Sequence, residues 1–304
     1  MSMYRRYTIA GEGAGPRLLI MAGVHGDEVE PMLAVARLRQ KINASELKGQ
    51  VTLIPVANES AFERLARTGD DELDLARTFP GNAAGSRTEQ LAADLTKEIQ
   101  TADYLIDLHT GGAGLEILPM CGFMLHEDGR VLDAQRRMAE AFDLPIIWGT
   151  SPALNGRTLS AARDALAPAI YAEHGGGGGF SVQTSLDYEA GCIKVMAALG
   201  MIEPFLFHSR VRLRVDDWGE GSGYLQACHP SPVDGVFVPE VTLGERVVAG
   251  QEIGRVVNLF TAEEAALLAE KSGIVLLLHR SPTVKRGAGL CVIIDGETPI
   301  EAPR

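Results

Sequence analysis

A histidine and a glutamate stand three positions apart in GVHGDE, residues 23–28. This stretch directly follows the apolar run RLLIMA, which has the composition of a buried strand. Imidazole nitrogens and carboxylate oxygens are ligands of zinc, and a catalytic zinc site needs three protein ligands and one open position for water. His25 and Glu28 are therefore candidates for two of the three ligands.

A third ligand can come from a second apolar run. His109 ends the stretch ADYLIDLH, and open α/β sheets bind their substrates at the carboxyl ends of strands. Asp107 shares the strand face of His109 by period-two geometry and could orient it by a hydrogen bond. On spacing alone, Asp27 or Glu30 could serve as well as Glu28. The pattern indicates a metal site without fixing its carboxylate ligand.

The elements that would position these residues follow an alternating pattern. Five short apolar runs have the composition of strands buried on both faces, and they cover residues 18–22, 51–56, 104–108, 146–148 and 169–172. Helical periods lie between them. The clearest begins at Ser86 with the capping-box pattern SRTE and continues with Leu91, Leu95 and Ile99 on one face. This alternation predicts an α/β fold with a mainly parallel, doubly wound sheet.

The composition changes around residues 204–232, which are rich in proline and glycine. β-Branched residues and glycines dominate after this segment. We therefore expect a catalytic domain over residues 1–215 and a smaller all-β domain over residues 216–304.

The predicted second domain resembles a biotinyl/lipoyl-type sandwich, with residues 231–257 and 273–294 as its two halves. The connector, residues 258–273, looks partly helical and offers only Lys271 as an attachment point for a swinging arm. We favour a packing domain that walls or gates the active site over a carrier domain.

Composition excludes several classes of partner. The 304 residues include 28 basic and 40 acidic side chains, a net charge of −12, which disfavours nucleic acid and anionic membranes. No apolar run approaches the ~20 residues that span a bilayer, and the N-terminal stretch lacks the apolar core of a signal peptide. The four scattered cysteines predict buried free thiols. We expect a cytoplasmic protein that acts on a small molecule, with a homo-oligomer left open.

Five motifs occur in a specific order: GVHGDE (23–28), NESAFERLAR (58–67), DLARTFPG (74–81), DLHTGG (107–112) and AEHGG (172–176). In this order they resemble the motif set of the succinylglutamate desuccinylase/aspartoacylase family, over about residues 17–200. The resemblance implies the fold of the zinc carboxypeptidases and one zinc ion per chain.

The resemblance also implies a role for each matching residue. It implies zinc ligation by His25, Glu28 and His109. Glu173 would be the general base toward a metal-activated water, a role that a carboxylate can fill at neutral pH. Arg67 would stabilise the oxyanion, and Arg77 offers a planar fork matched to a substrate carboxylate. Asn58 is assigned to substrate binding.

Two positions depart from the family pattern. Ala76 stands where the family motif D-L-N-R has an asparagine that helps the arginine to hold the substrate carboxylate. Asn58 is followed by Glu59, where the family commonly has a proline. We hypothesise that the substrate differs from N-acetylaspartate and from succinylglutamate.

The residues and the resemblance together predict zinc-dependent hydrolysis of the amide bond of a small N-acyl amino acid or related N-acyl amine. Two alternatives stay open: a metallocarboxypeptidase acting on short peptides, and a non-catalytic metal-binding protein on the same scaffold. Glu173 speaks against the second, because a structural zinc site has four ligands and no use for a nearby base.

Overall fold

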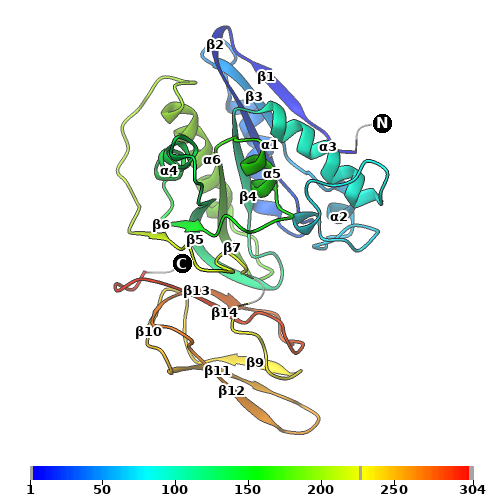
Figure 1. Cartoon of the computed structure of the whole chain (residues 1–304), viewed down its shortest axis with the longest axis vertical. Coiled ribbons are helices and arrows are strands. Elements are labelled where there is room, and N and C mark those ends of the chain that lie inside the picture. The colour runs from blue at the N-terminus through cyan, green and yellow to red at the C-terminus, as the bar shows by residue number, and fades with distance from the viewer. Residues whose placement is uncertain (1–2, 226–227, 301–304) are drawn as a thin grey trace.

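The described strands build one mixed sheet that runs through most of the molecule. The structure, a computed structural model, describes residues 3–225 and 228–300. Within these ranges eleven strands form a sheet with the main order β1-β3-β2-β4-β7-β5-β13-β10, extended by β14 on β13 and by β6 and β8 beyond β5 (Figure 1). A separate three-stranded sheet has the order β12-β11-β9.

The strands before residue 217 are β1 (Tyr7–Ala10), β2 (Gly13–Ala22), β3 (Lys48–Ile54), β4 (Tyr104–His109), β5 (Leu115–Met124), β6 (Ile146–Thr150), β7 (Ala169–Gly176) and β8 (Leu213–Asp216). The helices are α1 (Val29–Lys41), α2 (Glu59–Glu63), the 3-10 turn η1 (Leu75–Arg77), α3 (Arg87–Thr101), α4 (Gly129–Phe142), α5 (Thr158–Asp164) and α6 (Val182–Ala198). The later strands are β9 (Val236–Pro239), β10 (Arg246–Val247), β11 (Glu252–Val257), β12 (Glu264–Leu268), β13 (Gly273–His279) and β14 (Cys291–Ile294).

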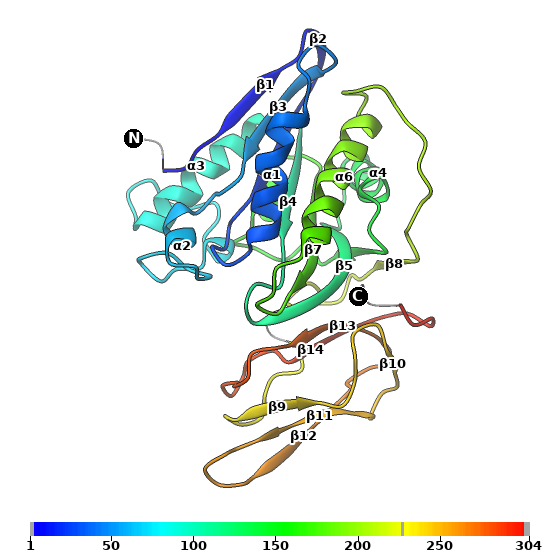
Figure 2. The ribbon, with the colours of Figure 1, turned by 180° about the vertical axis from the view of Figure 1, so that it is seen from behind.

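Helices cover both faces of the sheet, as an α/β fold requires. The helices α1, α4 and α6 pack together on one face, and α3 and α5 lie on the other (Figures 1 and 2). The helix α3 begins with the predicted capping box, in which Ser86 and Glu89 bond reciprocally. Its side chains Leu91, Leu95 and Ile99 are buried as predicted.

The prediction of an α/β sheet is confirmed, and the sheet is mixed rather than mainly parallel. Strands β3, β2, β4 and β7 are parallel neighbours, whereas β5 runs antiparallel to β7. All five predicted strands exist. The long strand β5 was not predicted, although eight of its ten residues are buried.

The chain after residue 216 is joined to the main sheet by backbone hydrogen bonds. Strand β13 pairs antiparallel with the first half of β5, with Leu277 opposite Ile117. The ion pair of Arg280 with Glu116 lies beside this pairing. The division at residue 215 and the biotinyl/lipoyl resemblance remain predictions, because the sheet crosses the proposed boundary.

The expectation of a partly helical connector over residues 258–273 is wrong. Residues 264–268 form β12, which pairs antiparallel with β11 from Val257↔Glu264 onward. The helix-forming composition of EAALL is overridden by this strand pairing and by burial of Leu267. Lys271 lies 3.1 Å from Asp295 in an ion pair.

Two further expectations concern cysteines and membranes. Cys121, Cys192 and Cys291 are buried free thiols as predicted, while Cys228 is half-buried. Each helix within the described ranges is too short or too polar to cross a bilayer.

The shared sheet predicts that both parts of the chain unfold together. Leu277→Ala removes a fully buried side chain at the β13–β5 junction and is expected to lower the free energy of unfolding by about 2–5 kcal/mol. Calorimetry of this variant should record a single unfolding transition at a lower temperature than that of the wild type. The matched control is Leu268→Ala on β12, which is half exposed and should change the stability by no more than about 0.5 kcal/mol. A separate, unshifted transition for the N-terminal part would contradict the shared sheet.

Candidate metal centre and active site

The three predicted metal ligands converge at the carboxyl ends of neighbouring parallel strands. His25 follows β2, Glu28 is the N-cap residue of α1, and His109 is the last residue of β4. Strands β2 and β4 are hydrogen-bonded in parallel, so their ends meet. One ligand atom from each of the three residues lies within 4.8 Å of the others, and all three side chains are buried.

Besides Glu28, each of the two imidazoles contacts another carboxylate, which orients its ring. His25 Nε2 lies 3.3 Å from Asp74 Oδ1, and His109 Nε2 lies 3.0 Å from Asp107 Oδ2. A carboxylate accepts a hydrogen bond from Nε2–H, which fixes the tautomer and leaves Nδ1 with its lone pair. The two Nδ1 atoms then face Glu28: His25 Nδ1 is 2.7 Å from Oε1, and His109 Nδ1 is 3.0 Å from Oε2. The predicted orienting role of Asp107 agrees with this geometry.

This arrangement of acceptors fits a bound cation. Nitrogen lone pairs that point at carboxylate oxygens repel one another unless positive charge lies between them. Burial would raise the pKa of Glu28, yet its contacts with His25 and His109 hold it well below its usual range. Two imidazole nitrogens and one carboxylate oxygen are a donor set typical of catalytic zinc. The three residues therefore fit zinc.

The alternative carboxylates have other partners. Asp27 Oδ2 accepts a hydrogen bond from the backbone N–H of Ala113 at 3.0 Å. Glu30 Oε1 accepts one from the backbone N–H of Ser181 at 3.1 Å. Only the carboxylate of Glu28, among the three considered from the sequence, meets both imidazoles.

Glu173 has the surroundings expected of a general base. It lies on β7 directly opposite His109 of β4 and is only 9% exposed. Its Oε2 is buried without a hydrogen-bond partner in the described structure. Burial, together with the charges of Glu28 and Asp107, raises the pKa of Glu173 to about 8, although His109 and Arg67 act in the opposite direction. A carboxyl group whose pKa lies near the working pH is suited to proton transfer.

Arg67 is fixed beside the ligand cluster by a carboxylate that also contacts His25. Its Nε and Nη2 donate to Asp74 Oδ2 at 3.0 and 2.9 Å. Burial would raise the pKa of Asp74, but the contacts with His25 and Arg67 hold it well below its usual range. Arg67 lines the same pocket as His25, so one carboxylate, Asp74, orients both residues.

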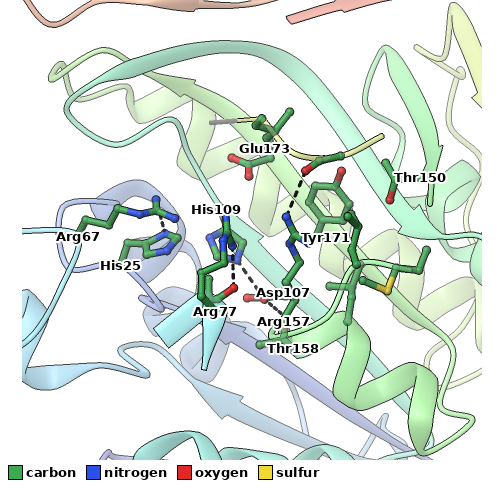
Figure 3. Close-up of a pocket in the computed structure, with 16 residues that line it drawn as sticks. His25, Arg67, Arg77, Asp107, His109, Thr150, Arg157, Thr158, Tyr171 and Glu173 are labelled. Atoms are coloured by element: carbon green, nitrogen blue, oxygen red, sulfur yellow. Dashed lines mark hydrogen bonds and ion pairs between the residues drawn. The ribbon is translucent and has the colours of Figure 1, made fainter. Parts of the chain in front are cut away.

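The pocket beside the ligand cluster contains a third arginine that the sequence analysis missed. Arg157 precedes α5, and its guanidinium lies between the ligand cluster and Tyr171 (Figure 3). Its Nη1 is buried without a hydrogen-bond partner in the part of the chain that the structure describes, and its Cζ lies 4.9 Å from the centre of the Tyr224 ring. Burial lowers the pKa of Arg77, and the charge of Arg157 lowers it further. Two such cations in one small pocket suit an anionic group.

No sequence pattern distinguishes Arg157 from the other arginines. It lies in an irregular loop, and the feature that marks it, contact with Tyr224 and the pocket, depends on residues far away in the chain. Its only local signal was a position just before the short helix α5.

Three other predicted features have different placements. Arg77 and Ala76 both line the pocket. Asn58 caps α2 by accepting from the N–H of Ala61 at 3.1 Å, and it is not among the residues that line the pocket. Its assignment to substrate binding remains a prediction. The glycine run 175–179 also lies outside this lining and bonds to the loop after β4, for example through Gly111 N–H and Gly175 O at 3.2 Å.

Comparisons with known proteins show the family of the chain. The model of the succinylglutamate desuccinylase/aspartoacylase catalytic domain matches residues 14–199. A curated protein from Halomonas elongata, N-alpha-acetyl-L-2,4-diaminobutyric acid deacetylase, is 29% identical over 296 residues, which cover 95% of this chain and 84% of the relative.

Solved structures extend the similarity over nearly the whole chain. The product-bound ectoine utilization protein EutE (DoeB) from Ruegeria pomeroyi has a TM-score of 0.86 at 26% identity, covering 95% of this chain and 87% of that one. A succinylglutamate desuccinylase from Silicibacter sp. TM1040 has a TM-score of 0.85 at 26% identity, covering 96% and 88%. The chain belongs to the succinylglutamate desuccinylase/aspartoacylase family.

Proposed function

We propose that this protein is a zinc-dependent amidohydrolase that removes the acyl group from a small N-acyl amino acid. One observation carries the proposal: Glu173, whose Oε2 has no hydrogen-bond partner among the described residues, lies buried beside the three-residue cluster of His25, Glu28 and His109. The activity of the family and of the relatives, which include a deacetylase and a desuccinylase, supports hydrolysis of an N-acyl bond.

The side chains divide the reaction between them. Zinc held by His25, Glu28 and His109 would supply Lewis acidity and lower the pKa of water toward ~7. Glu173 accepts the proton of the attacking water at its free oxygen and later delivers it to the leaving amine. Arg67, held by Asp74, donates hydrogen bonds to the oxyanion of the tetrahedral intermediate.

Arg77 and Arg157 are the binding site for the substrate carboxylate in this proposal. Both guanidinium groups line the pocket, and the Nη1 of Arg157 has no hydrogen-bond partner within the described residues. A carboxylate would neutralise their mutual repulsion and accept a hydrogen bond from that Nη1. Arg157 thus compensates for the asparagine that Ala76 replaces.

The small size of the pocket favours a small substrate over a peptide. The cavity has a volume of about 70 Å³, and Gly223 and Leu225 form part of its wall. An N-acyl amino acid needs less of this space than an extended peptide chain does. The wall comes from the part of the chain that we expected to gate the site.

The substitution Glu173→Gln tests the proposal. Loss of the general base should lower kcat by about 10²–10⁴-fold while the bound zinc is retained, because Glu173 is not a ligand. The measurement is release of free acid from a panel of N-acyl amino acids, with metal content determined in parallel. The exposed Glu203→Gln is the matched control and should keep wild-type activity. Unchanged hydrolysis by Glu173→Gln, or release of amino acids from dipeptides only, would refute the deacylase proposal.

The raised pKa of Glu173 predicts a pH-dependent stability in metal-free protein. The ordinary pKa of a glutamate is 4.5, so between pH 4.5 and about pH 8 Glu173 keeps its proton in the folded state and loses it in the unfolded state. The stabilisation that Glu173 gives to the folded state therefore decreases as the pH rises through this range. Glu173→Gln removes that loss. Its melting temperature, measured with chelator, should gain on the wild type between pH 5 and pH 8. A difference that is constant over this range would show that Glu173 ionises normally.

A further inference from the structure

One end of the pocket lies away from the ligand cluster and is apolar. Figure 3 places Tyr171 and Thr150 on the side of Arg157 opposite to His25 and His109. The pocket is also lined by four apolar side chains, Met124, Leu154, Leu159 and Leu225. A Cβ built on Gly223 would lie 2.8 Å from Leu154 Cδ1 and 3.1 Å from Thr150 Cβ, so Leu154 belongs to this end.

The segment 217–225 closes this end as a fixed wall. Asp217 N–H donates to Gly149 O at 2.8 Å, and Ser151 N–H donates to Ser222 Oγ at 2.7 Å. Gly223 has a φ of +87° and no space for a side chain, so its backbone packs directly on Leu154 and Thr150. The wall therefore leaves room only for what fits between these groups.

The pocket is lined by more arginine side chains than carboxylates. Among the described residues that line it, the carboxylates are Asp107 and Glu173. Asp107 is 1% exposed and bonded to His109, and Glu173 lies opposite His109 on the neighbouring strand. Arg77 and Arg157 are both cationic. Within the described residues, no carboxylate lines the apolar end to pair with a positive group.

We propose that the substrate, within the deacylase function on which this inference rests, is an N-acyl amino acid with an uncharged side chain, and that Leu154 helps to set this preference. The carboxylate is held by Arg77 and Arg157, and the side chain lies at the apolar end beside Leu154 and Gly223. A side-chain ammonium there would be desolvated beside Arg157 without a counter-ion. A second carboxylate would lose its hydration among apolar groups.

This preference separates the chain from its Halomonas relative, whose name specifies N-alpha-acetyl-L-2,4-diaminobutyric acid. The side chain of 2,4-diaminobutyrate ends in an ammonium group. Norvaline has a methyl group in its place, so the two N-acetyl amino acids are nearly isosteric and differ mainly in charge. Their relative rates measure the charge preference of the pocket directly.

The test compares kcat/KM of the zinc-loaded, full-length enzyme for N-acetyl-L-norvaline, N-acetyl-L-2,4-diaminobutyrate and N-acetyl-L-aspartate. We expect the norvaline derivative to be preferred over each of the others by at least about tenfold. Equal or better hydrolysis of either charged substrate would overturn the inference while leaving the deacylase function in place. Failure to hydrolyse any N-acyl amino acid would instead overturn both.

Two variants examine the role of Leu154 itself. Leu154→Asp places a carboxylate at the apolar end and should raise the rate for the diaminobutyrate derivative relative to norvaline by about tenfold. Leu154→Asn has the same size without the charge and should leave that ratio near the wild-type value. An equal change of the ratio in both variants would show that Leu154 does not act through charge. If Leu154→Asp folds poorly, the ratios of kcat/KM measured for the wild-type enzyme on the three substrates still test the inference.

Discussion

The site depends on the pairing of each ligand imidazole with a second carboxylate. Asp74 and Asp107 hold the Nε2 atoms of His25 and His109, so both Nδ1 lone pairs are turned toward Glu28. Without these two carboxylates either imidazole could rotate or carry its proton on the other nitrogen. The same Asp74 holds Arg67, so the position of the proposed oxyanion donor and that of a metal ligand depend on one side chain.

The fold supplies these contacts from distant parts of the chain. Parallel pairing of β2, β4 and β7 brings His25, His109 and Glu173 to one edge of the sheet. Tyr188 of α6 donates its hydroxyl hydrogen to the backbone carbonyl of His109 and fixes that strand end. The later part of the chain adds β13 to the same sheet. The segment that follows β8 lines the pocket with Gly223 and Leu225. The elements that carry the ligand cluster and those that close the pocket are thus parts of one hydrogen-bonded framework.

The sequence predicted the features that local patterns encode. His109 was a candidate because it ends an apolar strand, and the capping box at Ser86 is a local signal. Glu173 was assigned through the family resemblance, and it lies on β7. Asp74 lies within a recognised motif, but it is 49 positions from His25, and no local sequence pattern predicts the contact between the two side chains. Arg157 and the β13–β5 pairing were missed for the same reason, since long-range contacts define them. The connector before β13 was misjudged because its helix-forming composition is overridden by the β11–β12 pairing.

The central claim is that His25, Glu28 and His109 form a cation site, and metal content tests it most directly. Wild type and His109→Ala, purified side by side without chelator and then offered zinc, are compared by elemental analysis. About one zinc per chain is expected in the wild type, and its loss in the variant, because a three-ligand site with one ligand removed binds zinc far more weakly. Wild-type protein that takes up no metal even when zinc is supplied, or a variant that keeps its full content, would contradict the account.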